Sequence, residues 1–385
     1  MGGVEYTTLR VAQALDKSKF DPVIICPEEG DLPSLARQAG LNVHIVPRPK
    51  FFSVSFFWGN RYIANPLGFI FTAINVFYAV GILRKYLQSN PAELIITKGL
   101  LAHFYGGLAA NWQKIPCIWY VQEEVDAKRA GGLFRWLLQQ GAQHLAKKVL
   151  VDAQALVDQF GNSLPHDCIQ VIYNGVDINE FTPFTPQMKQ DARTRLGIPA
   201  NAVVIGQAGR LVPLKGQKIL LQAFNSIFRK FPDAHLLLVG APLFGDDAYQ
   251  QALKVFIDEN GLSERVIFTG FLPEVREGLA AMDIFVNASL ETDSPVAVME
   301  AMASGLATIV SAVDGTIEMV TPEMDALVFP SGNKDALAEI LTLLLSSPLR
   351  MNELRTHARQ SAVQKFSLSA SVAKIQSSLE QVFAS

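Results

Sequence analysis

The sequence predicts an α/β protein with two domains, each containing a parallel sheet that helices cover on both faces. At 385 residues the chain is long enough for two domains. Short apolar segments alternate with helical ones in both halves, which is typical of βαβ units. The alternation breaks at Asn174–Asp177, before two prolines and a polar run. We therefore expect a first domain over 1–174, a second over 175–366 and a C-terminal helix over 367–385 that returns to the first domain.

Composition excludes several classes of protein. A formal net charge of −3 gives no basic field for nucleic acid. The three cysteines lie far apart and the six histidines show no ligand spacing, so we expect no disulfide framework, no metal site and a reduced cytoplasmic setting. Asp-x-Asp, Gly-x-Gly-x-x-Gly and Gly-Lys are all absent from the sequence. The metal–nucleotide carboxylate pair, the dinucleotide fingerprint and the P-loop are therefore not predicted.

The first domain begins unusually. Gly2 and Gly3 lead directly into an amphipathic helix over 6–15, with no strand or basic, apolar signal peptide before them. We therefore expect that the first strand of this sheet is missing. The remaining strands and helices follow in order: strands at 22–26, 42–46, 93–97, 117–121, 148–151 and 170–173, and helices at 32–39, 98–112 and 153–160.

Residues 51–83 are rich in apolar side chains. Aromatic residues begin the segment, the uncharged run 67–83 follows, and Arg84-Lys85 ends it. A spanning helix needs about 20 predominantly apolar residues, so this run is near the lower limit. Three interpretations stay open: a buried or partly exposed helix of the first domain, a peripheral contact with the membrane surface, and a true span.

The second domain repeats the alternation with strands at 203–209, 235–239, 265–269, 283–287, 307–310 and 326–329. Arg210 and Lys215 follow the first of these strands, before a helix at 219–228. A guanidinium and an ammonium on one short loop at a strand end can clamp a phosphate. Neutralising a departing diphosphate is electrostatic catalysis.

A second stretch fits the same ligand. After the strand at 283–287, a polar turn with Asp293 and Ser294 precedes a helix that starts near Pro295 and Val296 and ends at Gly305. The free N–H groups at a helix start favour an anion. Glu300, just beyond the first turn, can accept hydrogen bonds from sugar hydroxyls. The alternative is an ordinary strand–helix corner with a solvated acidic turn.

Other polar positions carry weaker signals. Gln122 and the acidic residues that follow it end a strand, where they either contact a substrate or form a solvated loop. His103 lies on a predicted helix, where a packed histidine is commoner than a catalyst. Phe271 and Leu272 follow a strand that ends at Gly270, and their backbone could lie against a nucleobase, as any such loop could.

These residues together resemble the GT-B glycosyltransferases of family 4, which are retaining enzymes. The resemblance rests on Asn174–Asp177 with Phe181, on Gly209-Arg210 with Lys215-Gly216, on Gly270-Phe271, on Pro295 through Gly305, and on 313–318. Gly2-Gly3 resemble the glycine pair that approaches the donor diphosphate. The likeness covers nearly the whole chain and is strong in the second domain.

The resemblance implies two Rossmann-like domains facing each other across a cleft, with a nucleotide sugar on the second and a glycan or lipid-linked acceptor on the first. Arg210 and Lys215 would bind the diphosphate, and Glu300 the donor ribose. No cofactor or metal is implied. The expected location is the cytoplasm, with the inner membrane face as an alternative.

Three departures from the family pattern matter. Thr292 stands where many members carry a Glu, with Glu291 and Asp293 on either side; one of these could substitute if the loop shifts, and Asp293 is slightly favoured. Gln122 stands where many carry a His, and an amide cannot act as a general base. The third is the missing first strand. A catalytically weak or inactive nucleotide-sugar-binding protein is therefore the alternative function. A sugar-nucleotide epimerase is a third reading, and a two-carboxylate glycosidase is disfavoured.

Overall fold

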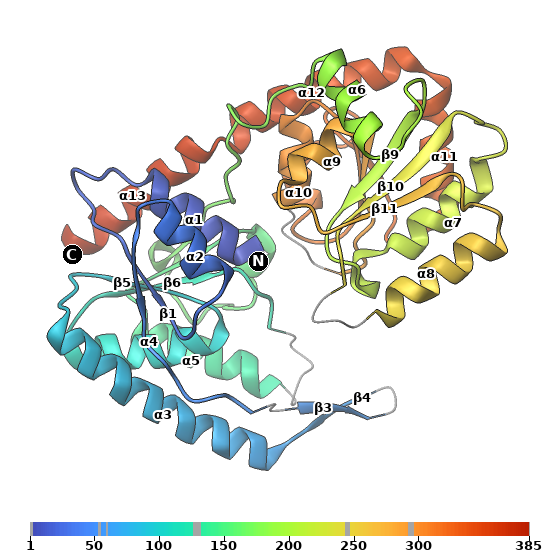
Figure 1. The fold of residues 1–385 in the computed structure, drawn as a ribbon. Coiled ribbons are helices and arrows are strands. Elements are labelled where there is room, and N and C mark those ends of the chain that lie inside the picture. Colours follow the sequence, from blue (N-terminus) through green and yellow to red (C-terminus); the bar gives the residue numbers. More distant parts are fainter. Residues whose placement is uncertain are drawn as a thin grey trace. The chain divides into compact units, whose positions relative to one another are not determined.

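The computed structural model describes residues 3–52, 55–58, 61–125, 132–242, 247–291 and 296–384. The chain divides into two compact units, Met1–Asn174 with Ser369–Ser385, and Gly175–Leu368. Figure 1 shows that both units combine strands with surrounding helices. Each unit is described by itself below.

In the described residues, the first unit contains five helices among its strands, a hairpin and the C-terminal helix. Its elements are α1 (Gly3–Ala14), β1 (Val23–Cys26), α2 (Asp31–Gln38), β2 (Asn42–Ile45), β3 (Ser55–Trp58), β4 (Arg61–Ala64), α3 (Pro66–Ser89), β5 (Ile95–Lys98), α4 (Leu100–Gln113), β6 (Cys117–Val121), α5 (Leu133–Leu145), β7 (Lys148–Val151), the 3₁₀ turns η2 (Gln154–Leu156) and η3 (His166–Cys168), β8 (Ile169–Val171) and α13 (Leu368–Ala384).

The parallel strands of this unit form two separate sheets. β1 pairs with β2, and β5 to β8 pair in chain order, while β3 and β4 form an antiparallel hairpin. Among the described residues no strand joins β1 to β5. An apolar cavity of about 730 Å³ lies between them, with Ile24 and Ile96 in its walls. The expectation of a missing first strand stays a prediction, and Gly2 itself lies outside the described residues.

The second unit has a single parallel sheet. Its elements are α6 (Pro186–Arg195), β9 (Val203–Ala208), η4 (Pro213–Lys215), α7 (Gln217–Ile227), β10 (Ala234–Val239), α8 (Ala248–Glu259), β11 (Val266–Gly270), α9 (Val275–Ala281), β12 (Ile284–Asn287), α10 (Val296–Ala303), β13 (Ala307–Ser311), η5 (Ile317–Met319), β14 (Leu327–Phe329), α11 (Lys334–Ser346) and α12 (Pro348–Lys365). The strand order is β11-β10-β9-β12-β13-β14.

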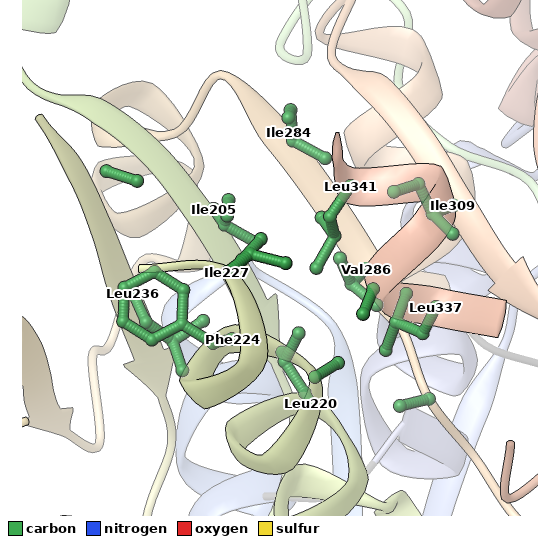
Figure 2. Close-up of a cluster of buried hydrophobic side chains, with 14 of the residues drawn as sticks. Ile205, Leu220, Phe224, Ile227, Leu236, Ile284, Val286, Ile309, Leu337 and Leu341 are labelled. Carbon is green, nitrogen blue, oxygen red and sulfur yellow. The ribbon is translucent and has the colours of Figure 1, made fainter. Parts of the chain in front are cut away.

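The core of the second unit lies between this sheet and the helices α7 and α11. Figure 2 shows Leu220 of α7 near Leu337 of α11, and the ring of Phe224 beside Leu236 of β10, within one buried cluster. Ile205 of β9 is fully buried among them. The central strands are apolar on both faces, as expected for a parallel sheet covered on both sides.

Three of the described helices begin with the same capping sequence, a polar N-cap residue followed by proline. Asn65, Thr185 and Ser347 each accept a hydrogen bond from a backbone N–H in the first turn of α3, α6 and α12. Proline follows each cap, where its missing N–H costs nothing. α6 occupies part of the polar run after Asn174–Asp177, where the sequence predicts a break between domains.

The predicted helix at 153–160 is wrong. Only the short turn η2 forms there, and Gly161 turns the chain with φ 52°. Side chains of α5 take the backbone carbonyls that a longer helix would need: Gln139 Nε2 donates to Gln159 O at 2.8 Å, and Arg135 Nε donates to the same oxygen at 3.1 Å. Tertiary hydrogen bonds therefore override the local apolar pattern.

α3 is the one helix among the described residues that is long and apolar enough to cross a membrane, a weak signal by itself. One face packs on α4 through Val80, Leu83 and Leu87. The opposite face is exposed, with six apolar residues between one-half and two-thirds accessible: Leu67, Ile70, Phe71, Ile74, Phe77 and Tyr78. We call these six residues the α3 stripe. α3 is thus a partly exposed helix of the first unit.

Candidate active site

The strand order of the second unit places two loops at one point of the sheet. β9 is the first strand of this unit and β12 the fourth, yet they are neighbours, and the chain proceeds outward from them in opposite directions. The carboxyl ends of strands at such a switch point are where open α/β sheets bind ligands. The loop carrying Arg210 and Lys215 follows β9, and the segment carrying Glu300 follows β12.

Backbone hydrogen bonds and two glutamine side chains hold the loop after β9. Gly209 N–H donates to Val239 O at 2.9 Å. Gln207 Nε2 donates to Lys215 O at 2.6 Å, and Gln217 Nε2 donates to Arg210 O at 2.8 Å. Arg210 itself is exposed, and no described residue hydrogen-bonds its guanidinium. The loop backbone is therefore fixed while the arginine side chain stays accessible to a ligand.

The two loops touch each other through their backbones. Leu290 N–H donates to Leu214 O at 2.8 Å. Gly216 has φ 67°, and a Cβ atom there would lie 1.9 Å from Ala288 O. A side chain at this position would therefore collide with the backbone of the second loop. Lys215 and the start of the segment leading to α10 are brought together by this close approach.

Glu300 lies on α10 with 5% of its surface exposed. The segment before the helix is anchored at Ser289: its carbonyl accepts from Ser311 Oγ at 2.6 Å, and its own hydroxyl donates to Asn287 Oδ1 at 3.0 Å. The Asn287 amide nitrogen is buried and has no hydrogen-bond partner among the described residues. Val296 is the first described residue of α10, while Asp293, Ser294 and Pro295 lie outside the described residues.

The loop after β11 presents an aromatic side chain. Gly270 turns the chain with φ 70°, and its carbonyl accepts from Gly240 N–H at 3.0 Å. Phe271 then is 65% exposed, and Leu272 is partly buried. An exposed ring at the carboxyl edge of the sheet offers a face on which a planar group can stack.

Gln122 lies in the first unit at the end of β6, within a hydrogen-bonded cluster. Its Nε2 donates to Asp152 Oδ2 and to Asn174 Oδ1, both at 3.1 Å, and Asn174 Nδ2 donates to Asp152 Oδ2 at 2.7 Å. Gln122 Oε1 is buried without a partner among the described residues. With both amide hydrogens used, the remaining oxygen can accept a hydrogen bond from a hydroxyl group.

His103 is a packed histidine, as its place on a helix predicts. Its Nδ1 lies 2.8 Å from Thr97 Oγ1, and its ring stacks on Trp119 with centroids 5.0 Å apart. Burial lowers the pKa of His103 to about 3, so the ring is neutral at physiological pH. Of the glycine pair, Gly2 lies outside the described residues and Gly3 is the first residue of α1.

The sequence singled out Arg210, Lys215 and Glu300 as candidates but not the residues that fix the backbone around them. Gln207 and Asn287 are single polar residues in apolar strands, and Gln217 is the first residue of α7, so no spacing marks them in the sequence. Asp152 and Asn174 are 22 residues apart in sequence and meet only in the folded sheet. Among the described residues, no group of three or more His, Cys, Asp or Glu side chains is placed to hold a metal ion.

Comparison with protein families covers both units. Residues 1–180 match the family model for Glycosyltransferase Family 4, and residues 188–364 match that for Glycosyl transferases group 1. The chain belongs to the group 1 glycosyltransferases. This group 1 chain has the GT-B fold of two Rossmann-like domains. It superposes on the crystal structure of Anabaena HepE in complex with UDP and glucose with a TM-score of 0.82. The two sequences are 23% identical, and the match covers 98% of this chain and 96% of that one.

Two curated relatives show the range of the group. A GDP-mannose-dependent phosphatidylinositol monomannoside mannosyltransferase of Corynebacterium glutamicum is 31% identical over 59% of this chain, and the match spans 62% of that protein. An Escherichia coli galactosyltransferase that acts on GlcNAc-diphosphoundecaprenol is 24% identical over 97% of this chain and 92% of that protein. Several further relatives are matched over about half of their length.

Proposed function

We propose that this chain transfers a sugar from a nucleotide-diphosphate donor to a hydroxyl group of a glycan or lipid-linked acceptor. The observation that carries the proposal is the meeting of two loops at the switch point, through Gly216 against Ala288 and Leu290 against Leu214. This contact puts the loop of Arg210 and Lys215 beside the segment that leads into the helix of Glu300. Cations and helix N–H groups at one sheet edge suit a diphosphate.

The chemical roles follow from the residue types. Arg210 can bind phosphate oxygens in a fork and Lys215 as a point charge, which stabilises the diphosphate as the sugar–phosphate bond breaks. Glu300 accepts hydrogen bonds from donor hydroxyls, and Phe271 offers its ring to the base. We propose that no metal or cofactor takes part, because two side-chain cations supply the charge that a metal would provide. We propose Asp293 as a contact to the donor sugar.

We further propose that the reaction retains the anomeric configuration, as the family resemblance implies. Gln122 would orient the acceptor hydroxyl through Oε1 and would not remove its proton, because an amide has no basic site near neutral pH. The departing phosphate would then accept the proton. Gln122 is thus assigned a positioning role for the acceptor.

The acceptor is proposed to be lipid-linked and reached at a membrane surface. The two relatives described above carry lipid acceptors in their names, phosphatidylinositol monomannoside and diphosphoundecaprenol. In this chain the α3 stripe exposes six apolar side chains on one helix face, with Arg84 and Lys85 near the end of that helix. Apolar residues backed by cations suit the surface of an anionic bilayer.

Sugar transfer to a lipid extract, followed by mass spectrometry, tests the proposal. Lys215→Ala is expected to slow transfer by on the order of 10²-fold, as for loss of one preorganised charge in a reaction site. The exposed Lys218, three positions later, provides the control Lys218→Ala, which should transfer like the parent. Nucleotide binding without any transfer would favour the alternative of an inactive binding protein.

A further inference from the structure

Three polar side chains meet at the carboxyl ends of neighbouring strands in the first unit. Gln122 directly follows β6, Asp152 directly follows β7, and Asn174 lies three residues after the end of β8. The last residues of β6 and β7, Val121 and Val151, pair with each other, so Gln122 and Asp152 leave the sheet at the same level. Asp152 is 2% exposed and Asn174 is 5% exposed. The cluster is therefore nearly closed to solvent, where polar groups need hydrogen-bond partners.

The Asp152 carboxylate determines which atoms of the two amides face it. Asp152 Oδ2 accepts hydrogen bonds from Gln122 Nε2 at 3.1 Å and from Asn174 Nδ2 at 2.7 Å. An ionised carboxylate only accepts hydrogen bonds, so both amides must turn their nitrogen atoms towards it. Asn174 Oδ1 then accepts the second hydrogen of Gln122 Nε2, also at 3.1 Å. These bonds use both hydrogens of the Gln122 amide and leave its Oε1 for another partner.

The surroundings of Asp152 favour its ionised form. Two amide N–H groups donate to its Oδ2, which stabilises the carboxylate over the neutral acid. Lys98, at the end of β5, is a nearby cation: burial lowers the pKa of Lys98 to about 7, while the charge of Asp152 acts in the opposite direction. An amide in place of this carboxylate could present either nitrogen or oxygen to Gln122, whereas the carboxylate presents oxygen alone. The charge of Asp152 therefore fixes one orientation of the Gln122 amide.

We infer that Asp152 is a positioning residue for the acceptor, because its carboxylate holds Gln122 with Oε1 towards the acceptor hydroxyl. The part that concerns the acceptor rests on the proposed function, whereas the orientation of the amide does not. Gln122 Oε1 is buried and has no hydrogen-bond partner among the described residues. A hydroxyl that donates to this oxygen keeps its lone pairs for attack on the donor sugar. A reversed amide would instead donate to the hydroxyl and engage one of those lone pairs.

NMR on the whole chain tests the orientation of the amide by itself. With ¹⁵N-labelled glutamine, the side-chain amide signal of Gln122 is the one that disappears in Gln122→Met. We expect its hydrogens to exchange with water slowly, because both are bonded within a buried cluster. Asp152→Asn should speed this exchange about tenfold or more, as for loss of a hydrogen bond to a charged group. Asp158→Asn, at an exposed aspartate in the segment after the same strand, is the matched control and should leave the exchange unchanged.

A cycle of Asp152→Asn, Gln122→Met and the double variant tests the role towards the acceptor. Sugar transfer is measured at limiting amounts of the lipid extract, and nucleotide affinity by calorimetry. Each single variant should slow transfer by about threefold to tenfold, as for loss of one neutral hydrogen bond, with nucleotide affinity unchanged. The double variant should transfer no more slowly than Gln122→Met, because Asp152 acts through Gln122. Asp158→Asn should transfer like the parent.

A purely structural role for Asp152 gives different results. Asp152→Asn would then lower the melting temperature without slowing transfer, or would slow transfer by the same factor whether or not Gln122 is present. Either result would overturn the inference, and so would a Gln122 amide that exchanges equally fast in the parent and in Asp152→Asn. If the parent transfers no sugar to the extract, the proposed function fails. Exchange of the Gln122 amide still decides in that case whether Asp152 sets its orientation.

Discussion

The Cα atom of Gly216 faces the carbonyl oxygen of Ala288 so closely that a Cβ atom would lie 1.9 Å from that oxygen. Gly216 is the N-cap residue of α7 and directly follows Lys215, and Ala288 directly follows β12. The contact is thus between the two loops that carry the proposed donor site. It makes the arrangement of that site depend on one glycine.

Gly216→Ala is expected to separate the two loops. The methyl group must displace backbone atoms, which costs about 1–3 kcal/mol of folding stability for an overpacked position, and nucleotide affinity should fall with it. Gly197→Ala is the control, because Gly197 has nearly the same φ, 68° against 67°, but open space around its Cα. Urea unfolding and calorimetric titration with nucleotide give both quantities. Equal behaviour of the two variants would contradict the role given to this contact.

Asp283 is expected to be a main determinant of stability in the second unit. Its carboxylate pairs with Lys189 and Arg193 at 2.6 Å and with Arg355 at 3.0 Å. Burial opposes ionisation, but these cations outweigh it and lower the pKa of Asp283 below its usual 3.8. The stabilisation is therefore present above about pH 4 and lost as the pH falls through the lowered pKa.

Asp283→Asn should cost about 3–5 kcal/mol of unfolding free energy at pH 7, because it leaves partly buried cations without their partner. Urea denaturation measures the loss. Glu29→Gln, which removes an exposed pair with Arg37, is the comparison and should leave the unfolding midpoint unchanged. A midpoint for Asp283→Asn equal to that of the parent would show that the cluster contributes little.

His103 should make the protein sensitive to acid. Because burial lowers the pKa of His103 from 6.5 to about 3, the folded state holds the ring neutral where the unfolded state protonates it. Stability should therefore fall as the pH drops from about 6.5 towards 3, by up to about 1.4 kcal/mol per pH unit. His103→Phe keeps a ring on Trp119 and should flatten this dependence. Urea midpoints between pH 4 and 7 measure it, with exposed His166→Phe as a control that should follow the parent.

The α3 stripe should bind membranes. Replacing Ile70 and Phe77 by Ser removes two of its six apolar side chains, and flotation with anionic vesicles should then decrease severalfold while the melting temperature changes little, since both positions are exposed. Leu349→Ser, at a 79% exposed leucine of the second unit, is the control. If the parent does not float with vesicles, or the double variant floats equally well, the stripe serves another purpose.

The sequence was sufficient for the alternation of strands and helices, because this alternation depends on local signals, while the assignment of Arg210, Lys215 and Glu300 to a donor site stays a prediction. Arg210, Lys215 and Glu300 stand at strand ends or helix starts, where residue type and position can be read together. The strand order that brings β9 beside β12 is a tertiary property. The sequence therefore predicted the residues but not the contact between Gly216 and Ala288.

The features that the sequence did not predict correctly also depend on tertiary contacts. Residues 153–160 have a helix-like apolar pattern, yet Arg135 and Gln139 bind the carbonyl of Gln159 from another helix. The hairpin β3–β4 lies in the aromatic part of residues 51–83, for which the sequence predicts no strands. Asp152 and Asn174 could not be assigned to the Gln122 cluster, because residues separated by 30 and 52 positions from Gln122 meet only in the folded sheet.

The most direct test of the donor site is a calorimetric titration of the chain with UDP, GDP and ADP, without metal and in the presence of a chelator. We expect one of the three to bind, and Lys215→Ala and Glu300→Gln each to weaken that binding at least tenfold, as for loss of a charge-assisted hydrogen bond worth about 1.5–3 kcal/mol. Lys218→Ala should bind like the parent. Absence of binding to well-folded protein, or binding that neither Lys215→Ala nor Glu300→Gln alters, would contradict a nucleotide-sugar site at the β9–β12 switch point.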